Sequence, residues 1–293
     1  MSETDWLAER FEENRSHLRA VAYRILGSPS EADDAVQESW LRLSRSDASG
    51  IENLGAWLTT VVSRVCLDML RSRTARRDEP LDAHPAEPAL NYDQQIDPEQ
   101  EALLADSVGL AMLVVLNRLT PAERLAFVLH DTFAVPFEEI AAILARSPTA
   151  ARQLASRARR RVRGAAALPA NASQQREVAD AFLAAMRAGD FEGLVAVLDP
   201  DVVVRVDEAA AGTGAAREIH GAENWAKGAI AFARHFRFVE PALVNGNAGL
   251  IWAPHGRLLR ALSFTIEGGK IVQAEIIADP ARLRQLDLAI LNG

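Results

Sequence analysis

The feature that most limits how this chain can fold is the stretch from Leu119 to Arg163, which reads as helices joined by a tight turn and ending in a run of arginines. Between Arg118 and Arg163, nine arginines stand against four acidic residues, a net charge of +5 within a chain whose formal net charge is −8. The positive charge is therefore concentrated in one segment.

Cap and turn signals in this stretch predict a helix-turn-helix. The sequence Thr120–Glu123 forms a capping box with proline at the first helical position. A second helix is expected from about Phe137. Ser147 followed by Pro148 then starts a third helix only a few residues after the second one ends. A turn this short is typical of the motif.

The third helix is expected to separate apolar from basic residues. The residues expected inside are Ala151, Leu154, Ala155, Ala158 and Val162, and those expected outside are Arg152, Ser156, Arg159 and Arg163. Arginine is the residue most often used to contact guanine in the major groove, and it also pairs with phosphates. The pattern therefore favours a DNA-binding helix. A solvated amphipathic helix is the alternative, because arginines also suit the C-terminal end of a helix dipole.

Length and composition limit the remaining possibilities. A chain of 293 residues is long enough for roughly two or three domains. The single cysteine, Cys66, permits neither an internal disulfide nor a cysteine metal cluster. The first residues are acidic, and no apolar stretch approaches the length of a membrane span. We expect a cytoplasmic protein that needs no metal or cofactor.

Two amphipathic helices are predicted near the start, the first over 5–26. Ser28-Pro29-Ser30-Glu31 forms a capping box with proline at the first helical position, so the second helix is expected to begin there and to run to about Leu43. The second helix carries Asp33, Asp34 and Glu38 on its outer face near its N-terminus. Acidic residues at that end stabilise any helix, so this surface is either a helix-dipole effect or a partner-binding site.

A third apolar stripe runs from Leu54 to Met69, and its other side carries Trp57, Arg64 and Arg71. Arginines for phosphates and a flat ring for unstacked bases suit an opened DNA strand, although a tryptophan at this spacing also suits a core. A proline-rich segment then interrupts the pattern.

The last part of the chain changes to mixed helix and strand patterns. The expected helices are Gln174–Ala188, Phe191–Leu198 and Ala222–Ala233, and the expected strands are Val202–Asp207, Phe236–Val244, Leu250–Ala253, Leu258–Ile266 and Ile271–Ile277. Two all-α units therefore precede one α+β domain.

Three segments together resemble the extracytoplasmic-function sigma factors of bacterial RNA polymerase. SPSEADDAVQESWLRL resembles the family's region 2.2, GAWLTTVVSRVCLDMLRSR resembles regions 2.3 and 2.4, and the stretch from Leu119 to Arg163 resembles region 4. GDFEGLVAVLDPDVVVRVD and IHGAENWAKGAIAFA resemble a SnoaL-like domain, an α+β cone. The expected boundaries are 1–77 for region 2, 78–100 for a linker, 101–166 for region 4, 167–172 for a short linker and 173–293 for the SnoaL-like domain.

Some positions depart from the family pattern. Ala145 stands where the family's turn usually has glycine, so the turn must accept a side chain. Where related subgroups carry a tryptophan-containing linker motif and a DGGG segment, this chain has LDAHPAEP and DEAAAGTG, whereas DPARL resembles the family's C-terminal motif.

The resemblance implies a role for individual residues. The residues that would bind the polymerase clamp are Asp33, Asp34, Gln37 and Glu38. Those that would contact the −10 element are Asn53, Trp57, Arg64 and Arg71. Those that would contact the −35 element are Ser147, Thr149, Arg152, Ser156 and Arg157. The implied partners are the β and β′ subunits of core polymerase and promoter DNA.

The SnoaL-like resemblance also raises the question of catalysis, since such folds host cyclases and isomerases. The candidate bases are Asp201, Asp207, His220 and His235. Both tyrosines, Tyr23 and Tyr92, lie outside the domain, so a tyrosine oxyanion donor is missing. We therefore expect no enzyme. A bifunctional cyclase or isomerase and a repressor that acts without polymerase are the alternatives.

The last domain is instead expected to regulate the sigma regions within the same chain, by docking through Asp279, Pro280, Ala281, Arg282 and Leu283. A tethered domain has a high effective concentration for its neighbours, and the apolar residues that follow favour packing. The resemblance leaves room for an unknown small ligand or regulatory partner of this domain.

Overall fold

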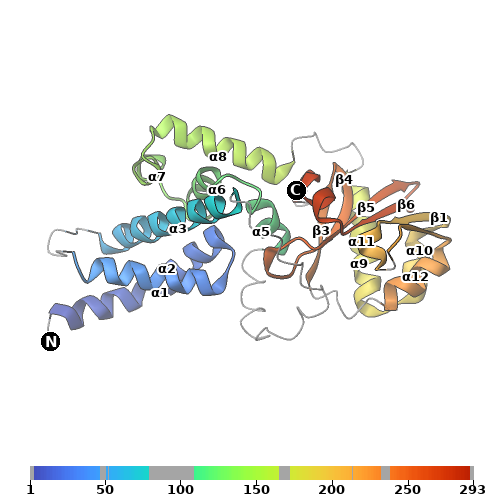
Figure 1. Ribbon diagram of the computed structural model, residues 1–293, viewed down its shortest axis with the longest axis horizontal. Helices are drawn as coiled ribbons and strands as arrows, with labels where there is room; N and C mark the ends of the chain where they lie inside the picture. Colours follow the sequence, from blue (N-terminus) through green and yellow to red (C-terminus); the bar gives the residue numbers. More distant parts are fainter. Residues whose placement is uncertain are drawn as a thin grey trace. The chain divides into compact units, whose positions relative to one another are not determined.

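The computed structural model describes residues 3–46, 51, 53–78, 109–164, 172–212, 214–231 and 238–290 (Figure 1). The chain divides into two compact units, one made of Met1–Glu87 and Leu116–Arg159, the other of Pro88–Val115 and Arg160–Gly293. Among the residues described, no helix is long and apolar enough to cross a membrane.

The first unit begins with three helices, α1 (Glu3–Leu26), α2 (Pro29–Leu43) and α3 (Leu54–Asp78), which pack on one another. Their cores come from apolar residues at helical spacing, including Phe11, Leu18 and Leu58, all of which are fully buried. The predicted start of α2 is confirmed, because the Ser28 hydroxyl accepts a hydrogen bond from the Glu31 amide and proline follows the cap.

The same unit contains the expected helix-turn-helix, formed by α6 (Pro121–Phe127), α7 (Phe137–Leu144) and α8 (Pro148–Arg163). The capping box of Thr120 and Glu123 is present. A π-helical turn, η3 (Val128–Thr132), follows α6 and was not expected from the sequence.

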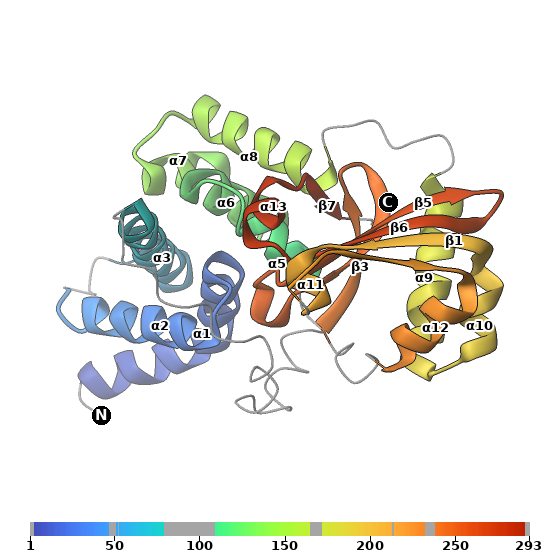
Figure 2. The same cartoon turned by 45° about the vertical axis from the view of Figure 1, so that its right-hand side comes forward.

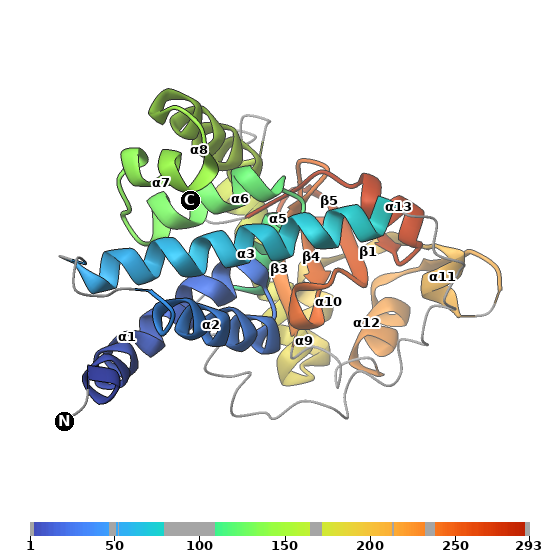
Figure 3. The ribbon, with the colours of Figure 1, turned by 60° about the vertical axis from the view of Figure 1, so that its left-hand side comes forward.

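The helix-turn-helix packs on the three-helix group within the first unit. Helix α3 contacts α6 and α7, and α1 contacts η3. Figure 3 shows α3 running beneath α6 and α7. The turn after α7 is closed by Ala145 at a φ of 52°, the left-handed conformation that glycine adopts without strain.

The second unit is built on a seven-stranded sheet. Its strands are β1 (Leu198–Val206), β2 (Arg217–His220), β3 (Val239–Val244), β4 (Asn247–Trp252), β5 (Arg260–Glu267), β6 (Lys270–Ile277) and β7 (Leu288–Ile290), in the order β2-β1-β6-β5-β4-β3-β7. β1 and β6 are parallel, and the other pairs are antiparallel.

Three helices pack against the sheet: α9 (Ala172–Ala188), α10 (Phe191–Val197) and α12 (Ala222–Ala231). Figure 2 shows them gathered on one side of it. The rings of Phe182, Trp225 and Phe264 meet in the core between helices and sheet. The shorter elements are α5 (Leu110–Leu116), α11 (Glu208–Ala211), η5 (Pro254–Gly256) and α13 (Pro280–Gln285).

The fold class expected from the sequence is confirmed, with helical sigma-like parts followed by an α+β domain. Each expected strand has a counterpart, whereas the short elements β2, α11, α13 and β7 were not predicted. Most of the expected linker 78–100, the start of region 4 at 101–108, and the short linker up to Asn171 lie outside the described residues.

Candidate nucleic-acid and polymerase interface

Helix α8 presents the surface that the sequence predicts. The Ser147 hydroxyl accepts a hydrogen bond from the Ala150 amide at 3.2 Å, so this side chain caps the helix. All five residues expected inside are buried, while Thr149, Arg152 and Ser156 are exposed. The helix therefore offers one continuous polar face to a partner.

Several arginines of α8 are held by acidic residues of the preceding helices. Arg152 donates to the Glu138 carboxylate at 3.1 Å and lies over the Phe137 ring. Arg157 donates to Glu123 at 3.0 Å. Glu123 is only 3% exposed and also completes the capping box, so Arg157 supports the fold of the motif. The Arg152 pair lies on the surface, where such pairs are worth little and break easily.

The residues assigned to the −10 element lie along α3. Trp57, Arg64 and Arg71 recur every seven residues, with Trp57 half-buried and both arginines exposed. Asn53 uses its side chain to accept from the Ala56 amide at 3.0 Å, which caps the start of α3. Arg64 donates to the Ala142 carbonyl at 3.4 Å, so a residue of the helix-turn-helix occupies part of this face.

The acidic surface of α2 is largely open. Asp33, Asp34 and Gln37 are exposed and Glu38 is half-buried. Within the unit, Arg19 donates to Asp33 at 2.7 Å and Arg42 donates to Glu38 at 3.0 Å. These are surface pairs, so a partner can compete for the carboxylates at little cost.

Arg124 has a position that the charge pattern did not predict. It belongs to the positive segment, yet its side chain is only 3% exposed, between α6 and the end of α1. It donates to the Asn117 side chain and to the Arg24 carbonyl, the latter at 3.5 Å. The carbonyl end of a helix attracts a cation, which explains the site. Burial lowers the pKa of Arg124 to about 9, so its charge is retained at neutral pH.

Arg124 also acts on Cys66 of α3. The thiol is fully buried, and burial raises its pKa to about 12 in spite of the opposing effect of the Arg124 charge. On the other side of Arg124, a side chain added at Gly27 would approach its guanidinium to 3.1 Å. The contact between the helix-turn-helix and the three-helix group is therefore closely fitted around one buried cation.

The candidate catalytic residues of the second unit do not form a constellation. Asp207 accepts hydrogen bonds from the amides of Ala278 and Asp279, both at 3.0 Å, and caps α11. Asp201 and His220 are exposed. His235 lies outside the described residues. The Asp207 carboxylate is therefore occupied by backbone hydrogen bonds, which does not suit a catalytic base.

The tail residues assigned to interdomain regulation sit against their own sheet. Asp279 caps α13, with Pro280 at its first position, and Leu283 is buried. Arg282 donates to Glu275 at 2.5 Å and approaches Asp207 at 3.6 Å. β7 then pairs with β3. The apolar tail therefore finds partners inside its own unit.

The second unit also contains both ends of the segment that carries the helix-turn-helix. Leu110 of α5 belongs to the core of the α+β domain, and the Ala111 amide donates to the Glu240 carboxylate of β3 at 2.9 Å. At the other end, a side chain added at Gly164 would lie 3.2 Å from Ala289 of β7. The α+β domain thus holds the segment just before α6 and just after α8.

Comparisons with known proteins identify the family to which the two helical parts belong. Family models described as Sigma-70 region 2 and Sigma-70, region 4 match residues 10–76 and 110–162. The ECF RNA polymerase sigma factor SigJ of Mycobacterium tuberculosis is 39% identical to this chain. The match covers 92% of this chain and 91% of SigJ. The probable ECF RNA polymerase sigma factor SigI of the same species is 33% identical over the full length of both chains. The crystal structure of SigJ covers 94% of this chain and 98% of its own, with 36% identity and a TM-score of 0.46.

Proposed function

Since the chain belongs to the extracytoplasmic-function sigma factors, which direct promoter-specific transcription initiation, we propose that its two DNA-reading surfaces are packed together in the free protein and separate on the promoter. The observation that supports this proposal most directly is the contact of α3 with α6 and α7 around the buried Arg124. The proposal places the chain in the cytoplasm with core RNA polymerase.

In this proposal α8 reads the −35 element in the major groove. The exposed face that follows Ser147 supports the assignment of Thr149, Arg152 and Ser156 to DNA. Arg157 contributes through its pair with Glu123, which orients the helix. Helix α3 takes the −10 element, where Arg64 and Arg71 hold the backbone of the melted strand and Trp57 offers a flat ring.

Geometry then requires the two parts to separate. The −35 and −10 elements are about 25 base pairs apart, which is roughly 85 Å of straight duplex at about 3.4 Å per step. Elements in direct contact cannot reach both sites at once. The chain between them supplies enough length, since a segment as long as residues 79–108 spans at most about 100 Å when extended.

The α+β domain acts as the intramolecular regulator. Its hold on α5 through Glu240, and on the end of α8 through β7, supports this role, because α6 to α8 cannot move far while both flanks are fixed. Asp279, Pro280, Arg282 and Leu283 contribute by anchoring the tail that carries β7 to the sheet. The enzyme alternative is not favoured, because relatives that match this chain over most of its length are sigma factors.

Transcription by purified core polymerase tests the proposal. Asp33, Asp34 and Glu38 are changed to Asn, Asn and Gln, which removes the clamp charges without setting lysines against Arg19 and Arg42. We expect core binding and promoter-specific transcripts to be lost while the fold is kept. The matched control changes Glu9, Glu12 and Glu13 of α1 to Gln and should transcribe normally. Normal core binding by the folded α2 variant would remove the clamp role.

A further inference from the structure

The α+β domain contains a cavity of about 220 Å³ between α9, α11, α12 and the sheet. Its walls are mainly apolar and aromatic. Phe182, Trp225, Leu250 and Trp252 are among the residues that line it. Arg217 and Gly228 also line the cavity and are exposed, so it is open to solvent on that side.

Two arginines give the cavity a positive charge. Arg260 of β5 and Arg217 of β2 both line it, and none of the described residues that line it is acidic. Burial lowers the pKa of Arg260, and the charge of Asp207 opposes this effect. Asp207 is already engaged by backbone amides and approached by Arg282. An anion inside the cavity would therefore meet favourable charge without a competing carboxylate in the wall.

Size limits the ligand further. An engineered apolar cavity of about 150 Å³ holds benzene, so a volume of about 220 Å³ suits one or two small rings. Two indole rings and a phenyl ring favour a flat molecule, because offset stacking and edge contacts stabilise aromatic pairs. Arginine favours a carboxylate, which it binds through two parallel hydrogen bonds.

We infer that this cavity is a binding site for a small aromatic carboxylate, with the rings between Trp225 and Trp252 and the carboxylate held by Arg260 and Arg217. Among the described residues, the walls offer no carboxylate or imidazole base, so the proposal is for binding alone. This assignment does not depend on the proposed sigma activity, because binding is measured on the full chain without polymerase.

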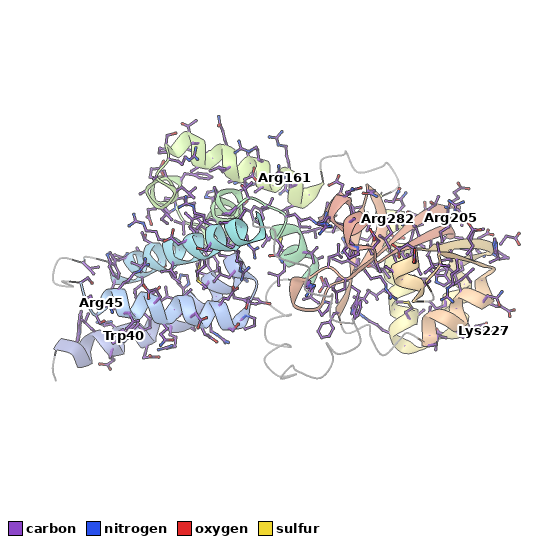
Figure 4. All side chains as sticks on the ribbon, viewed as in Figure 1. Trp40, Arg45, Arg161, Arg205, Lys227 and Arg282 are labelled. Carbon is purple, nitrogen blue, oxygen red and sulfur yellow. The ribbon has the colours of Figure 1, made fainter. Side chains whose placement is uncertain are left out.

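The test is calorimetric titration of the full-length protein with 2-naphthoate and with its neutral counterpart 2-naphthamide. We expect saturable binding of the acid, and binding of the amide that is weaker by about tenfold or more, because charge-assisted hydrogen bonds are roughly twice as strong as neutral ones. Arg260→Gln should reduce both the affinity for the acid and its advantage over the amide. The control Arg205→Gln removes a surface arginine of β1 that pairs with Glu218, and it should bind the acid normally (Figure 4).

A second variant tests the site independently, in case Arg260→Gln does not fold. Gly228 lines the cavity and a side chain added there meets nothing within 4 Å, so Gly228→Leu adds bulk at the cavity wall without displacing a neighbour and should weaken binding of the acid. Absence of saturable 2-naphthoate binding to the native chain would overturn the inference. So would equal affinity for acid and amide, or binding that persists unchanged in both Gly228→Leu and Arg260→Gln.

Discussion

At the scale of single residues, Cys66 reports on the contact between α3 and α6. Its thiol is buried beside the charge of Arg124, and burial raises its pKa to about 12. At pH 8 the thiolate fraction is then lower than that of an ordinary cysteine by a factor on the order of a thousand. The one cysteine of this chain should therefore resist alkylation in the native state.

We predict that iodoacetamide labels Cys66 of the free protein roughly a thousand-fold more slowly than a free thiol at pH 8. The rate should rise with pH, because only the thiolate reacts and burial raises the pKa of Cys66. Mass spectrometry of timed samples measures it. Rapid labelling of the native chain at pH 8 would mean that Cys66 is not held in the closed contact.

Ala145 is the second residue with a specific expectation. Its left-handed φ of 52° costs a residue with a side chain about 1 kcal/mol or more, whereas glycine adopts it freely. Ala145→Gly should raise the free energy of unfolding by about 0.5–1 kcal/mol. Ala142→Gly, at an exposed helical position three residues earlier, should lower it by about the same amount. Urea denaturation compares the two, and a loss of stability in Ala145→Gly would contradict the strain.

At the scale of elements, local signals carried most of the information. The caps at Ser28, Thr120 and Ser147, and the apolar periodicity of α1 to α3, predicted where helices begin and which faces they bury. The short elements β2 and β7 were missed because their stability comes from pairing with β1 and β3. Strand pairing of this kind joins distant residues and has no local signature.

In the candidate site, too, the sequence predicted what depends on local spacing and missed what depends on contacts between distant residues. Exposure of Arg152 and Ser156 follows from helical spacing, so the sequence predicted it. The burial of Arg124 does not, because the pocket that holds it includes the Arg24 carbonyl of α1, a hundred residues away in sequence. The same holds for the Glu240 contact with α5, which depends on where β3 lies.

Arg152 is the cleanest test of the recognition helix. Arg152→Ala should weaken specific promoter binding by about 1–3 kcal/mol if it contacts a base, and should flatten the salt dependence by about one counterion if it contacts a phosphate. Arg157 is less informative, because its loss would leave Glu123 buried without that partner. Fluorescence anisotropy at several salt concentrations measures both effects. Gln153→Ala serves as the neighbouring control, and identical binding by Arg152→Ala would displace α8 from the −35 element.

At the scale of the whole molecule, we propose that the α+β domain regulates the helix-turn-helix through the segments that flank it. Glu240 holds the Ala111 amide, and the preceding residue, Val239, lines the cavity that we assign to an aromatic acid. A ligand that contacts Val239 would therefore lie one residue away from Glu240, whose carboxylate accepts the hydrogen bond from α5. This arrangement gives regulation a physical route within one unit.

Glu240→Ala should loosen α5 and raise promoter-specific transcription several-fold at equal concentrations of folded protein. The carboxylate stabilises the positive end of α5, so its removal frees that helix to move. Glu267→Ala, an exposed position on the same sheet, is the matched control. Equal transcription from both variants and the native chain would count against regulation through this contact.

Opening of the first unit is the central claim, and energy transfer between two dyes measures it most directly. Dyes on Glu9→Cys of α1 and Glu139→Cys of α7 occupy exposed sites, and buried Cys66 stays unlabelled. A unit of this size has a radius of gyration of about 14 Å, so the free protein should show high transfer efficiency. On adding core polymerase and promoter DNA, efficiency should fall sharply as the parts separate towards roughly 85 Å. An unchanged efficiency in complexes that are transcribing would contradict the account.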